Sequence, residues 1–271
     1  MAELPELTIL QRQMHETLSG RSITLVEVLQ EKCLNAPVDQ AVSTLTGRRI
    51  AAVTRRGKWL YFHLQPELFL LLNLGMGADL WYSAPGAELP AKYQLRVVLD
   101  DGAGFTCGFW WFGYIRLLTG DELASFKETA KLGPSPLEIP PADLTAIARK
   151  FPRSTVKSLI LDQEKLSGIG NAYAHDVLWE ARLHPQRKLG TLSDDELARY
   201  HGAIARVMNR AMEMGGLERD FFRAQGNIDN FQGLMLIGYK EGKPCPRCGT
   251  PIVKIKTGAT AGFLCPACQT E

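Results

Sequence analysis

The sequence lacks the features of an exported or membrane-spanning protein. Its first residues contain no basic segment followed by a long apolar run, so we expect no signal peptide. The apolar run at residues 68–72 is far shorter than the roughly twenty residues that cross a bilayer, and it is typical of a buried strand. We therefore expect an intracellular, cytoplasmic protein without a membrane-bound part.

A strong charge of either sign is also missing. The chain has 31 Lys and Arg residues against 29 Asp and Glu, and a net charge of +2 does not by itself indicate nucleic-acid binding. Basic residues nevertheless gather in two places, at residues 149–157 and after residue 239. Such clusters suit a phosphate-binding face, although charged residues often form only a solvated surface. Their members are Arg149, Lys150, Arg153 and Lys157, then Lys240, Lys243, Arg247, Lys254 and Lys256.

Cysteine is scarce, yet four of the six cysteines form two C-x2-C pairs separated by sixteen residues. Two such pairs, joined by a β-hairpin across residues 250–264, offer the four thiolates of a tetrahedral zinc site. All four positions are then filled by protein, so the ion is structural. Two disulfides are the alternative, which the absence of an export signal disfavours. The expected ligands are Cys245, Cys248, Cys265 and Cys268, whereas Cys33 and Cys107 are isolated and expected to be buried.

The first 128 residues are expected to form mainly strands, after a helix at residues 7–18. Apolar runs punctuated by Gly and Asp are typical of antiparallel sheets that form a sandwich or barrel. The predicted strands lie at residues 22–28, 49–53, 59–64, 68–74, 93–99 and 114–118.

Beyond a proline-rich connector the pattern becomes helical. Apolar residues recur at helical spacing, and Ser193 and Gly215 supply a start and a stop signal for the longest helix. We predict helices at residues 144–150, 155–162, 171–181 and 194–215. The class is α+β, with a β-rich domain (1–128), a linker (129–143), a helical domain (144–232) and a zinc-finger hairpin (233–271).

Six segments, in order, resemble motifs of the formamidopyrimidine-DNA glycosylase/endonuclease VIII family. One match alone is weak, but six matches in the right order across the whole chain are specific. They are Glu-Leu-Pro-Glu at 3–6, Arg-Arg-Gly-Lys at 55–58, Leu-Gly-Met at 74–76, the connector at 132–137, Gly-Ile-Gly-Asn-Ala-Tyr at 168–173 followed by His-Pro at 184–185, and Gly-Lys-Pro-Cys at 242–245.

This resemblance implies an N-terminal antiparallel β-sandwich with flanking helices, a helix–two-turn–helix domain and a zinc-finger hairpin, acting on DNA as a monomer. The implied activity is extrusion of a damaged base, attack of the N-terminal amine on C1′ and strand cleavage by β-elimination. The implied roles are nucleophile for Ala2, general acid for Glu3, phosphate binding for Lys58 and Asn171, and filling of the vacated space for Met76.

Three positions depart from the family pattern. Ala2 replaces the usual proline, so the imine that it forms must be protonated before it can draw electrons. Trp111 replaces an arginine that enters the base stack; it either stacks on DNA or packs in the sheet. Thr260 replaces the arginine of the zinc hairpin, and Lys254 or Lys256 is expected to compensate in part. His175 stands where relatives often have a small residue, and we expect it on a helix surface.

Three hypotheses about the function of the protein follow from these residues. The first is a repair enzyme with base-removal or abasic-site lyase activity, associated with the nucleoid and using Ala2 and Glu3 on damaged or abasic-site duplex. The second is a non-catalytic binder of damaged or single-stranded DNA, which the three departures favour. The third is a zinc-ribbon protein acting on RNA or a protein partner, which fits the cysteines but not the rest of the chain.

Overall fold

The structure is a computed structural model that describes residues 2–109, 112–219, 222, 228–229 and 231–270. It contains two compact units, Met1–Lys131 with Glu218–Asp229, and Leu132–Leu217 with Asn230–Glu271. The segment 218–229, which we expected in the helical domain, therefore groups with the first unit. Its Phe222 explains why, because the Phe222 carbonyl accepts a hydrogen bond from Tyr82 N at 2.8 Å and its ring joins the core of that unit.

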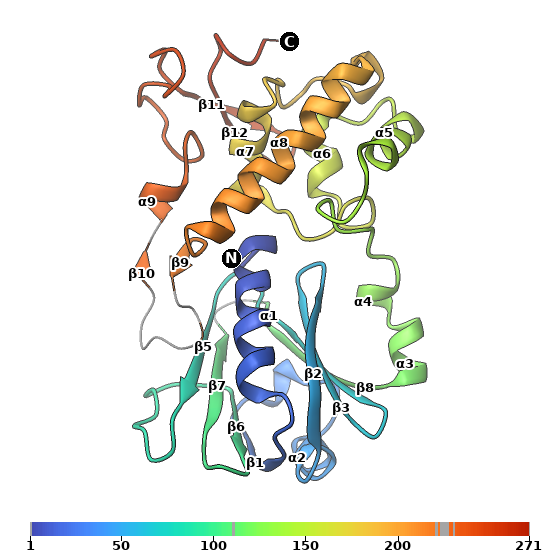
Figure 1. Ribbon diagram of the computed structural model, residues 1–271, viewed down its shortest axis with the longest axis vertical. Coiled ribbons are helices and arrows are strands. Elements are labelled where there is room, and N and C mark those ends of the chain that lie inside the picture. The colour runs from blue at the N-terminus through green and yellow to red at the C-terminus, as the bar shows by residue number, and fades with distance from the viewer. Residues whose placement is uncertain (1, 110–111, 220–221, 223–227, 230, 271) are drawn as a thin grey trace. The chain divides into compact units, whose positions relative to one another are not determined.

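Two four-stranded antiparallel sheets form the first unit (Figure 1). One has the order β1-β6-β7-β5 and the other the order β2-β3-β4-β8. The predicted sandwich is confirmed, although the sequence analysis missed β5 and β7. The strands are β1 Ile23–Val28, β2 Arg49–Arg56, β3 Trp59–Gln65, β4 Leu68–Asn73, β5 Ala78–Ser83, β6 Leu95–Leu99, β7 Gly104–Phe109 and β8 Tyr114–Thr119.

The core between these sheets is apolar and aromatic. Phe62 of β3 stacks on Phe105 of β7 with ring centroids 5.6 Å apart, and this contact joins the two sheets directly. The apolar run in β4 is buried at four of its six residues, as expected for a strand covered on both faces. Helices flank the sheets: α1 Leu4–Leu18, η1 Glu31–Cys33, α2 Val38–Leu45, α3 Gly120–Ser125 and α4 Lys127–Ala130, with the short strands β9 Glu218–Arg219 and β10 Ile228–Asp229.

Helices and a β-hairpin form the second unit. The longest helix, α8, begins as predicted at Ser193, whose hydroxyl accepts from Glu196 N while the Glu196 carboxylate accepts from Ser193 N. Helix α7 is almost entirely buried and contacts α6, α8 and the hairpin. The elements are α5 Pro141–Lys150, α6 Val156–Leu161, α7 Asn171–Glu180, η2 Leu189–Thr191, α8 Asp194–Glu213, α9 Phe231–Leu234, β11 Val253–Thr257 and β12 Thr260–Leu264.

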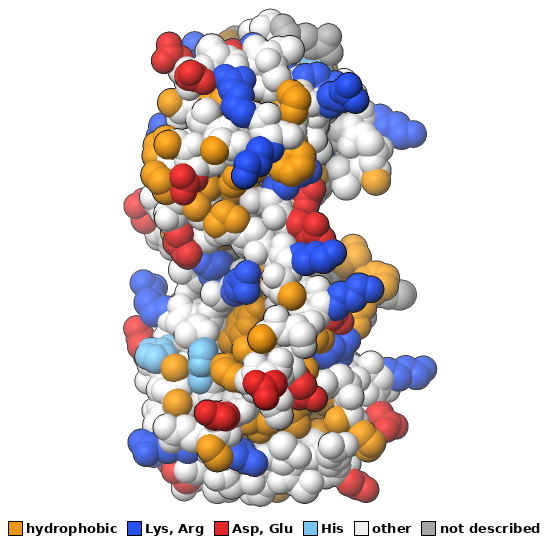
Figure 2. Space-filling view, turned by 90° about the vertical axis from the view of Figure 1, so that its right-hand side faces the viewer, with side chains coloured by type: hydrophobic (Ala, Val, Ile, Leu, Met, Phe, Trp, Pro, Cys, Tyr) orange, Lys and Arg blue, Asp and Glu red, His pale blue; other side chains and the backbone are white. Residues whose placement is uncertain are grey.

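Charged side chains of both signs lie on the visible face of each unit (Figure 2). This mixture agrees with the small net charge of +2. Among the described helices, none combines the length and the apolar character needed to cross a membrane.

Candidate functional site

A pocket of about 260 Å³ in the first unit brings Ala2 together with several predicted site residues. Ala2 is half-buried and lies in the wall of this pocket. The other lining residues are Lys58, Asn73, Leu74, Gly75, Met76, Phe112 and Tyr114.

Glu3 follows Ala2 in the chain, precedes α1 as its N-cap residue and is only 1% exposed. Its backbone N–H donates to Oε2 of Glu6 at 2.9 Å. This bond belongs to a capping box, in which the carboxylate of the third helical residue, Glu6, accepts from the backbone N–H of Glu3, the residue before the helix. Glu6 therefore fixes the backbone next to Ala2. We assigned Glu6 no role from the sequence, although its three-residue spacing from Glu3 is the signal for such a cap.

Lys58 lies at a tight turn between two paired strands. Gly57 and Lys58 form a two-residue loop, because Arg56 pairs directly with Trp59. Gly57 has a φ of +56°, which is typical of the first loop position of a type II′ hairpin. Only this sharp reversal lets the half-buried lysine extend toward the wall that contains Ala2.

Met76 protrudes from the turn that follows β4 and is 57% exposed. The side-chain Oδ1 of Asn73 accepts from Gly75 N at 3.0 Å, which shapes this turn. An exposed methionine above a pocket is suited to filling space beside a ligand. The neighbouring Phe112 is 65% exposed with a φ of +55°, whereas Trp111 lies outside the described residues.

Asn171 begins helix α7 in the second unit. Its Nδ2 lies 3.2 Å from the hydroxyl of Tyr239 and 3.3 Å from Nε2 of His175. Its Oδ1 is buried and has no hydrogen-bond partner among the described residues. The first backbone N–H groups of a ten-residue helix favour anions, so the Asn171 amide lies where a phosphate is well placed.

His175 is not on the helix surface as we expected; it is 1% exposed. Its Nδ1 accepts from the backbone N–H of Phe263 at 3.3 Å, and its ring packs edge-on against Tyr239 and Phe263. Burial, together with the positive charge of Lys157, lowers its pKa to about 3 and keeps the ring neutral. The expectation failed because the face of α7 that contains His175 is covered by the zinc hairpin.

Asp176, the next residue, fixes the segment that leads to the zinc finger. Its buried carboxylate accepts from the backbone N–H groups of three consecutive residues at 2.6–3.0 Å, and burial raises its pKa despite these bonds. The donors are Leu236, Ile237 and Gly238. Tyr239 follows immediately, and its φ of +61° turns the chain so that its hydroxyl reaches Asn171.

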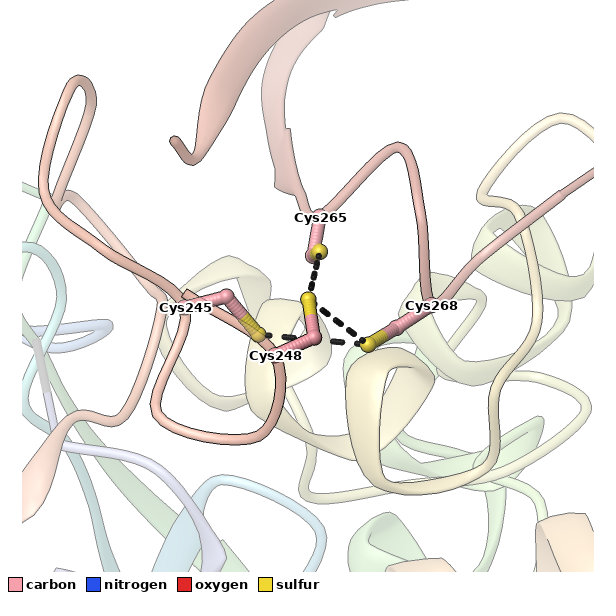
Figure 3. Close-up of side chains that lie close together, drawn as sticks. All are labelled: Cys245, Cys248, Cys265 and Cys268. Carbon is pink, nitrogen blue, oxygen red and sulfur yellow. Dashed lines mark hydrogen bonds between the residues drawn. The ribbon is translucent and has the colours of Figure 1, made fainter. Parts of the chain in front are cut away.

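The four predicted zinc ligands converge at one point (Figure 3). Their sulfur atoms lie within 4.8 Å of one another, and the closest pairs are 3.4–3.9 Å apart. Four sulfurs at 2.3 Å from a tetrahedral Zn²⁺ lie about 3.8 Å from each other. The residues therefore fit the ion, and the chain contains one structural zinc site. Cys33 and Cys107 are buried elsewhere, as predicted.

Helix α7 also supports the zinc site. Nε1 of Trp179 donates to Sγ of Cys245 at 3.3 Å, and the guanidinium of Arg247 lies 4.1 Å above the Trp179 ring. Arg247 also pairs with Glu180 at 3.3 Å. A hydrogen bond to a zinc-bound thiolate stabilises its charge. One helix therefore positions Asn171, the hairpin and the zinc ligands.

At the hairpin, the predicted DNA-binding residues Lys254, Lys256 and Thr260 are all exposed. Lys254 lies 5.9 Å from the centre of the Phe263 ring. The ammonium of Lys157 contacts the hairpin tip from below, a contact that the sequence analysis missed because no local pattern links residues a hundred positions apart.

Comparisons with known proteins cover the whole chain. Family models match the formamidopyrimidine-DNA glycosylase N-terminal domain at residues 1–107, its H2TH domain at 132–222, and a zinc finger found in FPG and IleRS at 242–270. The formamidopyrimidine-DNA glycosylase of Pelotomaculum thermopropionicum is 35% identical, with 99% of each chain covered. That of Lactococcus lactis subsp. cremoris is 28% identical over 100% of both chains.

Solved structures agree with these relatives. The Lactococcus lactis Fpg in complex with an abasic site containing DNA superimposes with a TM-score of 0.89 at 26% identity, over 100% of both chains. Its complex with a FAPY-dG containing DNA gives a TM-score of 0.88 over 99% of this chain. With both units and the zinc finger accounted for, the chain belongs to the formamidopyrimidine-DNA glycosylase family, as its sequence motifs predicted.

Proposed function

We propose that this protein is a bifunctional DNA glycosylase and abasic-site lyase that attacks C1′ of a damaged nucleotide with the α-amine of Ala2. One observation carries the proposal: the half-buried Ala2 lines the same pocket as Lys58 and Met76, and the buried Glu3 is the next residue in the chain. Such a pocket holds a nucleophile, a cation and a space-filling side chain together. Its proposed substrate is damaged DNA, and the family likeness supports action as a monomer at the nucleoid.

The nucleophile forms when the initiator methionine is removed, which the small Ala2 favours. An α-amine has an ordinary pKa of about 7.7–8.0, so part of it carries a free lone pair at neutral pH. That lone pair forms a bond to C1′ while the bond from C1′ to the base breaks, and the base leaves with a proton. Glu3 donates a proton to O4′ as the bond from C1′ to O4′ breaks, and the nitrogen lone pair forms the double bond to C1′, which leaves a protonated imine between Ala2 and C1′.

Strand cleavage follows from this imine. While it stays protonated, it accepts the electron pair that is released when a proton passes from C2′ to a base. The bond from C3′ to its phosphate oxygen then breaks, and the phosphate leaves with that electron pair. Lys58 supplies a positive charge beside that phosphate, and Asn171 binds a phosphate from the second unit. Met76 occupies the space that the extruded nucleotide leaves. Each role rests on family likeness; Met76 is exposed, and Lys58 and Asn171 are half-buried.

A second function is favoured by Ala2, Trp111 and Thr260, because each replaces a residue that relatives use in the reaction. In that case the protein binds damaged or single-stranded DNA without cleaving it. Glu3→Gln would then leave its function intact, whereas Trp111→Ala and Asn171→Ala would weaken DNA binding. An RNA- or protein-binding zinc ribbon has no comparable support, since the family match extends over all three parts of the chain.

Borohydride trapping on abasic-site duplex separates the two functions. We expect the processed protein to form a covalent adduct through the Ala2 nitrogen, and mass spectrometry should find a mature N-terminus that begins at Ala2. Two controls are matched to the mechanism: protein that retains Met1 has its amine displaced, and Glu3→Gln keeps the amine but lacks the acid. No adduct from processed protein, when a relative with an N-terminal proline is trapped under the same conditions, contradicts the catalytic proposal.

A further inference from the structure

A second pocket, of about 570 Å³, lies entirely within the second unit beside the tip of the zinc hairpin. Three cations line it, from two segments of the chain: Arg153 and Lys157 from the first, and Lys188 from the second. Thr257 and Thr260 at the hairpin tip supply hydroxyl groups. A pocket lined by three cations and several hydroxyl groups suits an anionic ligand.

Lys157 forms the floor of this pocket and is only 2% exposed. Its Nζ donates to Oγ1 of Thr257 at 2.8 Å, to Oγ1 of Thr260 at 3.0 Å and to the carbonyl of Ala261 at 2.5 Å. Burial lowers its pKa to about 8, so the ammonium is still mostly protonated at neutral pH. Its charge thus lies beneath the hairpin tip, and its hydrogen-bond partners among the described residues are all neutral oxygens.

The hydrogen bonds from Lys157 determine whether the hydroxyl groups of Thr257 and Thr260 can donate to a ligand. Each hydroxyl oxygen accepts from the ammonium, so its own proton must point elsewhere. The Thr257 hydroxyl donates to the carbonyl of Thr260 at 2.9 Å. The proton of the exposed Thr260 hydroxyl is directed away from the ammonium and is available to a ligand. The tip therefore presents a hydrogen-bond donor above a buried positive charge.

The rim adds two exposed cations. Neither the Arg153 nor the Lys188 side chain makes a hydrogen bond or ion pair within the part of the chain that the structure describes. The one carboxylate in the lining, Asp162, already accepts from Lys165 at 2.7 Å. Arg187, next to Lys188, is held by Glu196 at 2.6 and 2.9 Å and points to a different partner. The uncompensated charge is thus at Arg153 and Lys188.

We propose that this pocket binds a phosphodiester group of the DNA backbone through the Thr260 hydroxyl and the side chains of Arg153 and Lys188, above the fixed charge of Lys157. The site takes over the contact that relatives make with an arginine at the position of Thr260. The inference rests on the proposed function for its ligand, DNA. It assigns the compensating charge to Arg153, Lys157 and Lys188, whereas the sequence analysis assigned it to Lys254 or Lys256.

The test is the salt dependence of binding to a duplex with a stable abasic-site analogue, measured by fluorescence anisotropy. Removing one cation that neutralises a phosphate reduces the slope of log K against log[salt] by about 0.9. Because both side chains contact the same phosphate, we expect Arg153→Ala and Lys188→Ala each to lower the slope by up to about that amount and to weaken binding several-fold at low salt. Lys150→Ala is the matched control, because Lys150 is an exposed cation of the same unit outside the pocket lining.

The hydroxyl and the buried charge are tested separately. Thr260→Val keeps the side-chain shape but removes the donor, so it should weaken binding about fivefold, and Thr260→Ser should restore it. Thr260→Arg should bind at least as tightly as the unchanged protein. Lys157→Met removes the charge and should weaken binding with zinc content unchanged. If Lys157→Met does not fold, Arg153→Ala, Lys188→Ala and Thr260→Val still test whether the pocket binds a phosphate of DNA.

The outcomes distinguish this proposal from the proposed function. If the unchanged protein binds and is trapped on abasic-site DNA, but the rim variants change the slope no more than Lys150→Ala, the pocket is not a DNA phosphate site and the enzyme proposal stands. If inorganic phosphate perturbs the amide resonances of this pocket while DNA does not, the site serves a free anion and the inference is overturned. If the protein does not bind abasic-site DNA at all, the proposed function itself fails.

Discussion

His175 accepts a hydrogen bond at its Nδ1 from the backbone N–H of Phe263, 3.3 Å away, and so joins helix α7 to the zinc hairpin. The neutral ring must then carry its proton on Nε2. That nitrogen faces the amide of Asn171 at 3.3 Å. The proton on Nε2 requires an acceptor, which Oδ1 of Asn171 provides if the amide turns by half a revolution about its last bond. The histidine thereby fixes the orientation of the Asn171 amide.

We predict that the His175 ring is the Nε2–H tautomer and that Oδ1 of Asn171 accepts from it. The ¹⁵N shifts of the ring nitrogens should show a protonated Nε2 and an unprotonated Nδ1. Removing the donor with His175→Phe should weaken binding to abasic-site duplex roughly fivefold, about 1 kcal/mol for one neutral hydrogen bond. His175→Gln retains an N–H donor and should restore much of the affinity. A protonated Nδ1 would contradict this assignment.

Acidification should destabilise the second unit through the same residue. His175 has a pKa of about 3 in the folded chain and about 6.5 when unfolded, so only the unfolded chain takes up its proton between these values. The free energy of unfolding therefore falls as the pH falls through 6.5, by at most about 2 kcal/mol at pH 5. Urea melts with saturating zinc at pH 7 and pH 5 measure this difference. His175→Gln should show a smaller pH difference; an equal one would show that other groups cause it.

Zinc removal should loosen the hairpin while leaving the sandwich folded. The Trp179 indole donates to Cys245 and stacks under Arg247, so chelation should change tryptophan fluorescence. The hairpin contributes Phe263 to the surroundings of His175, and DNA binding should therefore fall more than tenfold. Cys248→Ser should reproduce the effect. Cys33→Ser, which changes a buried cysteine of the first unit, is the control, and it should keep stoichiometric zinc.

Glu6 should matter for catalysis although it touches no substrate. Its carboxylate holds the backbone N–H of Glu3 at 2.9 Å and so fixes the position of the Ala2 amine. Glu6→Ala should slow borohydride trapping about tenfold without weakening DNA binding, since only the alignment of the nucleophile is lost. Glu6→Gln keeps an acceptor oxygen and should retain most of the rate. If both variants instead lower affinity with an unchanged trapping rate, Glu6 supports the DNA contact surface and not the nucleophile.

The features that could be predicted from the sequence are those whose residues lie close together along the chain. Strand β4 has an uninterrupted apolar run, the apolar run of β3 is broken only by His63, and the zinc ligands have a fixed spacing, so the strands and the zinc site were predicted correctly. Strands β5 and β7 were missed because Gly and Asp interrupt their apolar pattern. The buried side chains of β5 and β7 are covered only when these two strands pair with each other and their sheet packs in the sandwich.

The site residues that were missed share one cause, contact between distant parts of the chain. In the sequence, Lys157 is one of several cations that are expected on the surface. In the structure it is covered by the hairpin tip, about a hundred residues later in the chain. His175 looked like a surface histidine for the same reason, because its covering residue is Phe263. The roles of Ala2 and Glu3 came from family motifs, and they remain proposals that kinetics must test.

The replacement of proline by Ala2 makes the most direct prediction about rate. A secondary amine forms an iminium that is already cationic, whereas the imine of Ala2 needs a proton before it can accept electrons from C2′. Ala2→Pro should therefore speed strand cleavage, most of all above pH 7.5, where protonation of the imine is hardest. Single-turnover cleavage of abasic-site duplex between pH 6 and pH 9 measures the effect. Ala2→Gly keeps a primary amine and should follow the unchanged protein. Equal rates for the proline and glycine variants at high pH would show that imine protonation does not limit the reaction. The residues around the amine would then set the rate of strand cleavage.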